Sequence, residues 1–160
     1  MMQTARYLFV CTANINRSPA AAMWTRQHFA NRFVNCDIRS AGTHGIDGLR
    51  AGPDMVLAMG QLGVDLRDHR TSALTSEAIS WADHIVVMEP AHAQIVLALH
   101  EGARGQLIPL WRYLDETNDH VVDPQGGPLE GFHKCAEELR RATAMLVDEH
   151  LAARRQQQST

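Results

Sequence analysis

Short apolar runs rich in β-branched residues alternate along this chain with longer segments of helical periodicity, and this alternation restricts the possible folds. The short runs predict strands at residues 6–10, 34–40, 84–88 and 106–110. The longer segments predict helices at residues 18–32, 51–62, 75–81, 90–100 and 130–153. Strands that alternate with helices are typical of a parallel sheet covered on both faces. We therefore predict a single three-layer α/β domain with a four-stranded parallel sheet.

The length and charge of the chain limit its organisation. Its 160 residues suffice for one domain with a substantial core. We assign residues 1–153 to this domain and expect a flexible, solvated tail at residues 154–160. The formal net charge of −3 does not indicate a nucleic-acid partner or an electrostatic membrane partner.

Targeting signals and cysteine content indicate the compartment. The N-terminal segment lacks the apolar stretch of a signal peptide, and no apolar run is long enough to span a membrane. The three cysteines are odd in number and widely spaced, which does not indicate a disulfide framework or a zinc site. We therefore expect a cytoplasmic protein with reduced thiols, no membrane insertion and no bound metal.

The loop after the first predicted strand carries the clearest chemistry. It runs over residues 11–17, from Cys11 to Arg17, and Ser18-Pro19 follow as the expected N-cap and first position of a helix. Loop N–H groups and a helix N-terminus attract an anion, and an arginine can bind two phosphate oxygens. A cysteine at the base of such a phosphate-binding loop predicts a nucleophile whose thiolate is stabilised by the same donors and by the Ser18 hydroxyl.

A phosphate ester also needs an acid to protonate its leaving group. Asp123-Pro124 lies in a glycine-rich loop just before the last predicted helix. Such a pair is common in plain turns, but an aspartate on a loop can also approach an anion site from above. Asp123 is therefore the candidate general acid.

These motifs resemble those of the low-molecular-weight protein tyrosine phosphatases, and the resemblance covers nearly the whole chain. The family pattern Cys-x-x-Asn-x-Cys-Arg-Ser-Pro matches residues 11–19 except at Asn16. Ser-Ala-Gly-Thr matches residues 40–43, His-Arg matches residues 69–70, and Asp-Pro matches residues 123–124. The resemblance implies hydrolysis of phosphotyrosine through a phosphocysteine intermediate, with no cofactor.

The resemblance also implies a role for each site residue. Cys11 would be the nucleophile, Arg17 would bind the phosphate, and Asp123 would act first as acid and then as base. The other phosphate-binding positions would be Thr12, Ala13, Asn14, Ile15, Asn16 and Ser18. The hydrogen bonds that hold the loop in shape would come from Asn14, Ser18, Ser40 and His69.

Two departures from the family pattern bear on function. Asn16 replaces the second loop cysteine, which in the family can form a protective disulfide with the nucleophile under oxidation. The segments that supply aromatic substrate walls in the family, here residues 44–49 and 125–127, contain no aromatic residue. Ile46 and Leu49 would provide an apolar substrate wall instead.

Three other functions are compatible with such a loop. A thiol-dependent arsenate reductase needs two further neighbouring cysteines, and residues 68–92 contain none. A phosphatase for phosphoarginine or for small aryl or acyl phosphates would suit a slot without aromatic walls, although Ile15 replaces the threonine of phosphoarginine phosphatases and favours tyrosine. A phosphate-binding module without activity would not need Cys11, Arg17 and Asp123 together.

The expected partners also follow from the resemblance. Bacterial members of the family often partner tyrosine kinases of capsule or exopolysaccharide export. We therefore expect a phosphotyrosine protein as substrate, with such a kinase as a candidate, and a monomer or weak dimer.

Overall fold

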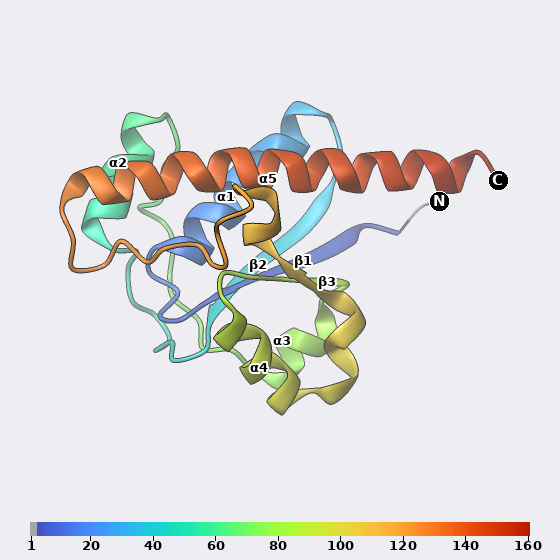
Figure 1. The fold of residues 1–160 in the computed structure, drawn as a ribbon, viewed down its shortest axis with the longest axis horizontal. Coiled ribbons are helices and arrows are strands. Elements are labelled where there is room, and N and C mark those ends of the chain that lie inside the picture. The colour runs from blue at the N-terminus through green and yellow to red at the C-terminus, as the bar shows by residue number, and fades with distance from the viewer. Residues whose placement is uncertain (1–2) are drawn as a thin grey trace.

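A parallel four-stranded sheet forms the middle layer of the computed structural model, which describes residues 3–160 (Figure 1). Its strands are β1 (Ala5–Cys11), β2 (Cys36–Gly42), β3 (His84–Val87) and β4 (Leu107–Pro109). Their order is β2-β1-β3-β4, and every neighbouring pair is parallel. This confirms the predicted sheet; the first two residues of the predicted domain lie outside the described part of the chain.

Helices cover both faces of this sheet, as predicted (Figure 1). One face carries α1 (Arg17–Asn31), α2 (Pro53–Gln61) and α5 (Leu129–Gln158). The other face carries α3 (Ser76–Trp81) and α4 (Pro90–Leu99). Two short 3₁₀ helices, η1 (Glu101–Gln106) and η2 (Leu110–Tyr113), flank β4.

The side chains of β1 alternate between two cores. Tyr7, Phe9 and Cys11 are buried in the core formed with α1, α2 and α5. Leu8 and Val10 are buried in the core formed with α3 and α4. Successive side chains of a strand point to opposite faces, so this register directs the thiol of Cys11 toward the α1 layer.

The strand order places the loop that follows β1 at a switch in topology. β1 lies between β2 and β3, so the chain first passes from β1 to β2 on one side and then crosses from β2 to β3 on the other side. Ligands bind at such points outside the carboxyl ends of the strands. Gly42, at the end of β2, lets the loop pass closely, because a Cβ there would lie 2.6 Å from the carbonyl oxygen of Thr12.

The structure corrects two predicted element ends. α1 begins at Arg17 with Asn16 at the N-cap position, and no side chain caps it, because the Ser18 hydroxyl bonds to Cys11 instead. α5 continues to Gln158, so residues 154–158, predicted to lie in a flexible tail, are helical. Arginine and glutamine are good helix formers, and no glycine or proline interrupts this stretch.

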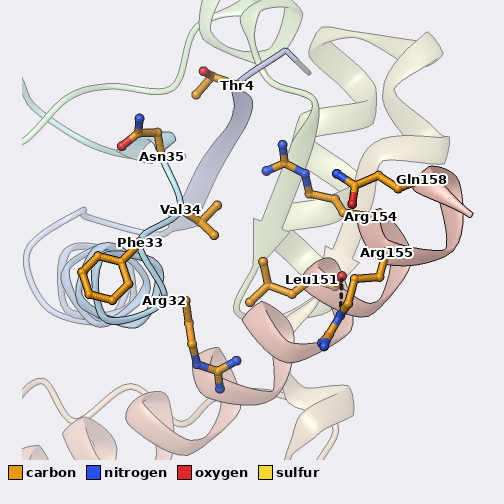
Figure 2. Close-up of a pocket in the computed structure, with 9 residues that line it drawn as sticks. All are labelled: Thr4, Arg32, Phe33, Val34, Asn35, Leu151, Arg154, Arg155 and Gln158. Atoms are coloured by element: carbon orange, nitrogen blue, oxygen red, sulfur yellow. Dashed lines mark hydrogen bonds between the residues drawn. The ribbon is translucent and has the colours of Figure 1, made fainter. Parts of the chain in front are cut away.

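The end of α1 carries an unusual residue. Phe33 follows the helix with a φ of 56° and is 97% exposed. Its N–H bonds to the Ala30 carbonyl, and the next N–H, from Val34, bonds to the Phe29 carbonyl. Glycine usually occupies this left-handed position after a helix. The residue borders a hollow of about 550 Å³ at the end of the molecule where both termini lie, next to the last turns of α5 (Figures 1 and 2).

We expect Phe33→Gly to raise the free energy of unfolding by about 0.5–1 kcal/mol. Removing the Cβ relieves about 1–2 kcal/mol of strain, and the added freedom of the unfolded chain offsets about 0.5–1 kcal/mol. Urea denaturation measures the change. Phe33→Ala is the control, because it removes the ring but keeps the Cβ; an equal gain in both variants would contradict the strain argument.

Candidate active site

The thiol of Cys11 lies at the floor of a small cavity. Its side chain is buried, and the Sγ atom lies 2.9 Å from the hydroxyl oxygen of Ser18. The cavity has a volume of about 60 Å³. It is lined by Cys11, Thr12, Ala13, Ile15, Asn16, Arg17, Asp123 and Gln125. The structure therefore brings the predicted nucleophile, arginine and acid to one cavity that is small enough for a single phosphoryl group.

Asn14 fixes the shape of the loop. It is fully buried and has a φ of 61°, which is rare for a residue with a side chain. Its amide nitrogen donates to the hydroxyls of Ser18 (2.8 Å) and Ser40 (2.9 Å), and its Oδ1 accepts from the backbone N–H of Ser72 (2.9 Å). His69 Nε2 donates to its backbone carbonyl (2.8 Å). The other three predicted loop-support residues therefore all bond to Asn14, and Ser72 is a fourth partner that the sequence did not indicate.

The backbone of this loop has unused donors. Among residues 3–160, no group accepts a hydrogen bond from the backbone N–H of any residue from 12 to 16. The N-terminus of α1 follows directly and adds the positive end of its dipole. Buried N–H groups without acceptors are costly, so this loop is suited to an anion that accepts several of them.

Arg17 is a buried cation held from several sides. Its side chain is 2% exposed, and Nη1 donates to Glu89 Oε2 (3.1 Å) and to the carbonyl of Val121 (2.8 Å). Nη2 donates to Thr12 Oγ1 (3.3 Å) and lies 3.6 Å from Asp123 Oδ2. These contacts fix the guanidinium beside the cavity, which reduces the entropy lost when it binds a phosphate.

Asp123 approaches the cavity from the opposite loop. Its side chain is 46% exposed, so a substrate can reach it. Its Oδ1 accepts the backbone N–H of Gln125 (3.0 Å), and the Gln125 Oε1 accepts the amide of Asn16 (2.8 Å). The residue that replaces the family's second cysteine therefore connects the phosphate-binding loop to the loop that carries the acid.

Glu89 and His92 belong to the site but were missed at the sequence level. Partial burial raises the pKa of Glu89, but the hydrogen bond and the charge of Arg17 lower it by more. The pKa of Glu89 therefore lies below its ordinary value. His92 is buried, and its Nε2 lies 2.9 Å from Thr12 Oγ1. Burial, with the nearby Arg17 charge, lowers the pKa of His92 to about 4. Both follow β3, so the rule that ligands bind at the carboxyl ends of strands was the available signal.

The predicted substrate wall lies outside the cavity. Ile46 is 66% exposed and Leu49 is 49% exposed, and neither lines the cavity over Cys11. Ile46 precedes Gly48 and Leu49 follows it in the connection after β2. The Thr71 hydroxyl donates to the Ile46 carbonyl and accepts the backbone N–H of Leu49. Their contact with a substrate remains a prediction.

The described part of the chain contains neither a candidate metal centre nor a membrane-spanning helix. Within residues 3–160, no three His, Cys, Asp or Glu side chains are grouped so that they could hold a metal ion. No helix in this part of the chain has the length and apolar composition needed to cross a membrane.

The fold and this loop define a cysteine-based phosphatase. Residues 6–157 match the model of the low molecular weight phosphotyrosine protein phosphatase family, and the chain belongs to that family. This confirms the family, the fold and the phosphatase class that the sequence motifs implied.

Similar proteins carry two different specificities. A protein-arginine-phosphatase from Geobacillus stearothermophilus is 29% identical over 143 residues, which are 89% of this chain and 94% of that protein. The probable low molecular weight protein-tyrosine-phosphatase EpsP from Ralstonia solanacearum is 35% identical over 134 residues, which are 84% and 88%. The crystal structure of a YwlE mutant from Bacillus subtilis has a TM-score of 0.85 at 28% identity and covers 91% of this chain and 98% of its own.

We expect acid to destabilise the protein through His92. The unfolded side chain titrates near 6.5 and the folded one near 4, so between these values the unfolded chain binds more protons and stability falls as the pH falls. Between pH 7 and pH 5 this single group accounts for a loss of about 2 kcal/mol. Urea denaturation of the wild type and of His92→Gln at both pH values measures the difference. Equal losses in the two proteins would contradict the low pKa.

Proposed function

We propose that this protein hydrolyses phosphotyrosine in proteins through a covalent phosphocysteine. The observation that carries the proposal is the convergence of Cys11, Arg17 and Asp123 on one cavity beside unused backbone donors. Positioning of a nucleophile, an anion site and an acid around one atom is what phosphoryl transfer requires of a protein.

In the first step Cys11 acts as a thiolate. Its Sγ attacks the phosphorus while the bond from phosphorus to the tyrosyl oxygen breaks on the opposite side. Asp123 donates its proton to that oxygen, so tyrosine leaves as the neutral phenol. Arg17 and the loop N–H groups stabilise the charge that spreads over the three equatorial phosphate oxygens.

In the second step water releases the phosphate. The Asp123 carboxylate takes a proton from water, and the water oxygen attacks the phosphorus as the bond from sulfur to phosphorus breaks. The thiolate of Cys11 is again the leaving group, and the Ser18 hydroxyl, 2.9 Å away, donates to it. Inorganic phosphate is the second product, and the enzyme returns to its starting state.

The roles of Glu89 and Gln125 are to position these groups. Glu89 holds one edge of the Arg17 guanidinium, which leaves the Nη2 side toward Thr12 and Asp123. Gln125 links the acid loop to Asn16. Both contacts keep the charged groups in register before a substrate arrives, which is the preorganisation that electrostatic catalysis needs.

Cys11→Ser should reduce the hydrolysis of p-nitrophenyl phosphate at least about 10³-fold, because a serine hydroxyl is a much weaker nucleophile and leaving group than a cysteine thiolate. Asp123→Ala should cost about 10²–10⁴-fold with phenyl phosphate, whose leaving group needs a proton, and much less with p-nitrophenyl phosphate. Steady-state phosphate release measures both. Retained activity in Cys11→Ser would overturn the mechanism. An equal effect of Asp123→Ala on both esters would overturn the assignment of Asp123 as the general acid.

Phosphoarginine is the second candidate substrate, because a relative from Geobacillus stearothermophilus is named as a protein-arginine-phosphatase. Ile15 at the edge of the cavity favours tyrosine, since an apolar side chain contacts an aromatic ring better than a guanidinium. We expect phosphotyrosine peptides to have a higher kcat/KM than phosphoarginine peptides, and Ile15→Thr to reduce that ratio. A preference of the wild type for phosphoarginine would reverse the assignment.

Asn16 should make peroxide inactivation irreversible. A sulfenic acid at Cys11 lacks the second thiol that the family pattern places in the same loop, because Asn16 occupies that position, so we expect oxidation to proceed to the sulfinic acid. We expect dithiothreitol to restore little activity to the peroxide-treated wild type and most of the activity to Asn16→Cys. Asn16→Ser, which removes the amide without adding a thiol, is the control. Full recovery of the wild type would contradict this prediction.

We propose phosphotyrosine proteins as partners, among them a tyrosine kinase of exopolysaccharide export, as the family resemblance implies. A nucleophilic thiol without a protective partner is suited to a reducing compartment, which supports a cytoplasmic location. A monomer or weak dimer is the proposed oligomeric state.

A further inference from the structure

A second hollow, of about 500 Å³, lies behind the phosphate-binding loop. Its walls come from α1, from the edge strand β2 and from the connection between α2 and α3. This volume is in the range of sites that bind small organic molecules. We call it the rear hollow, and none of the catalytic roles proposed above uses its interior.

Three arginines line the rear hollow, and none of them is neutralised. Within residues 3–160, neither Arg26, Arg39 nor Arg70 forms an ion pair with a carboxylate. Arg26 donates to the Ile38 carbonyl (2.6 Å), and burial lowers its pKa. Arg70 donates to two backbone carbonyls, and Arg39 stacks 4.1 Å from the ring centre of Trp81. All three side chains are exposed at the surface of the hollow, and guanidiniums grouped without a paired carboxylate favour an anionic ligand that they can bind through charge-assisted hydrogen bonds.

The acidic and apolar residues of the rear hollow further define the ligand that it favours. Two carboxylates line the hollow, and Asp65 already pairs with Arg67 (2.8 Å). Asp68 therefore remains as the one negative charge to balance the three arginines of the lining. The hollow therefore has an excess of positive charge in a chain whose formal net charge is −3. Met23 and Leu66 contribute apolar lining. An anion that also carries an apolar or aromatic group matches this combination.

The rear hollow shares a wall with the phosphate-binding loop. Ser40, His69 and Ser72 line it, and each of them also bonds to Asn14. The hydroxyl oxygen of Ser40 accepts a hydrogen bond from the Asn14 amide. The hydroxyl proton of Ser40 has no acceptor among the described residues. A ligand oxygen that accepts this proton would polarise the hydroxyl and strengthen its bond to Asn14.

We propose that the rear hollow is an effector site for an organic anion with an aromatic or apolar group, such as an aryl carboxylate, sulfonate or phosphate monoester. Arg26 and Arg39 bind the anionic group, and the apolar lining holds the rest. Occupancy restrains Ser40 and His69, which reduces the freedom of Asn14 and favours the loop shape that binds phosphate. The ligand and phosphate therefore bind with positive coupling.

The fluorescent probe 8-anilinonaphthalene-1-sulfonate tests the binding. We expect one saturable site in the wild type, and at least a tenfold increase in Kd for Arg26→Gln/Arg39→Gln, which removes two charge-assisted contacts. The matched control is Arg154→Gln/Arg155→Gln, which removes the same charge from the separate hollow that Phe33 borders (Figure 2). Near-UV circular dichroism verifies that each variant is folded. Unchanged binding in the first variant, or an equal loss in the control, overturns the proposal.

Coupling is tested by repeating the titration with inorganic phosphate. We expect saturating phosphate to lower the Kd of the probe about fivefold, a typical coupling between sites, and the probe to lower the Kd of phosphate by the same factor. A probe that binds in the phosphate-binding loop itself would instead be displaced, which overturns the proposal. Ser40→Ala should keep probe binding and lose the coupling.

The coupling rests on the proposed function because it requires phosphate to bind the loop. The two proposals nevertheless fail separately. Hydrolysis of p-nitrophenyl phosphate reports on the loop alone, and the probe titration without phosphate reports on the rear hollow alone. A protein that hydrolyses the ester but shows no phosphate-dependent change in probe affinity refutes the effector site and leaves the phosphatase mechanism intact.

Discussion

The left-handed conformation of Asn14 is the constraint on which the site depends. A side chain at a φ of 61° costs about 1 kcal/mol or more, and it persists only where surrounding contacts enforce it. Here the side-chain amide, its oxygen and the backbone carbonyl are all bonded to residues of other elements. That single turn directs the backbone of residues 12–16, whose N–H groups find no hydrogen-bond acceptor among residues 3–160. Because these contacts hold the loop close to the shape that binds phosphate, only a small part of the free energy of ordering it remains for a ligand to supply.

Charge balance is the second constraint. Arg17 is almost completely buried, and an isolated cation in that position would be strongly unfavourable. Glu89 offsets the charge permanently, whereas Asp123 lies farther away and is half exposed. A substrate phosphate can therefore replace the weaker partner without leaving the cation unpaired. This division is consistent with the proposed roles, in which Glu89 holds the arginine and Asp123 acts on the substrate.

Asn16 shows how one substitution changes two properties. In the family pattern this position holds a thiol beside the nucleophile. Here the side-chain amide of Asn16 donates to Gln125. Asn16 is also the N-cap residue of α1, and no side chain caps that helix. Gly52 accommodates it, because a Cβ there would collide with the Asn16 side-chain oxygen. The chain thus replaces a redox partner with a polar link between the two catalytic loops. Under the proposed mechanism, the hydrogen bonds from Asn16 to Gln125 and from Gln125 to Asp123 link the anion site to the acid.

The sequence by itself determined the parallel sheet, its flanking helices and the phosphatase family, because these are recorded in local periodicity and in contiguous motifs. It also singled out Cys11, Arg17 and Asp123, which the structure brings to one cavity and whose catalytic roles are proposed. It misjudged the first residue of α1 because the Ser18 hydroxyl bonds to a thiol rather than to the helix backbone. Only the tertiary structure decided that Glu89, Ser72 and Gln125 join the site. Their contacts depend on how β3, the connection between α2 and α3, and the loop before α5 pack against the end of β1, and no local pattern specifies that packing.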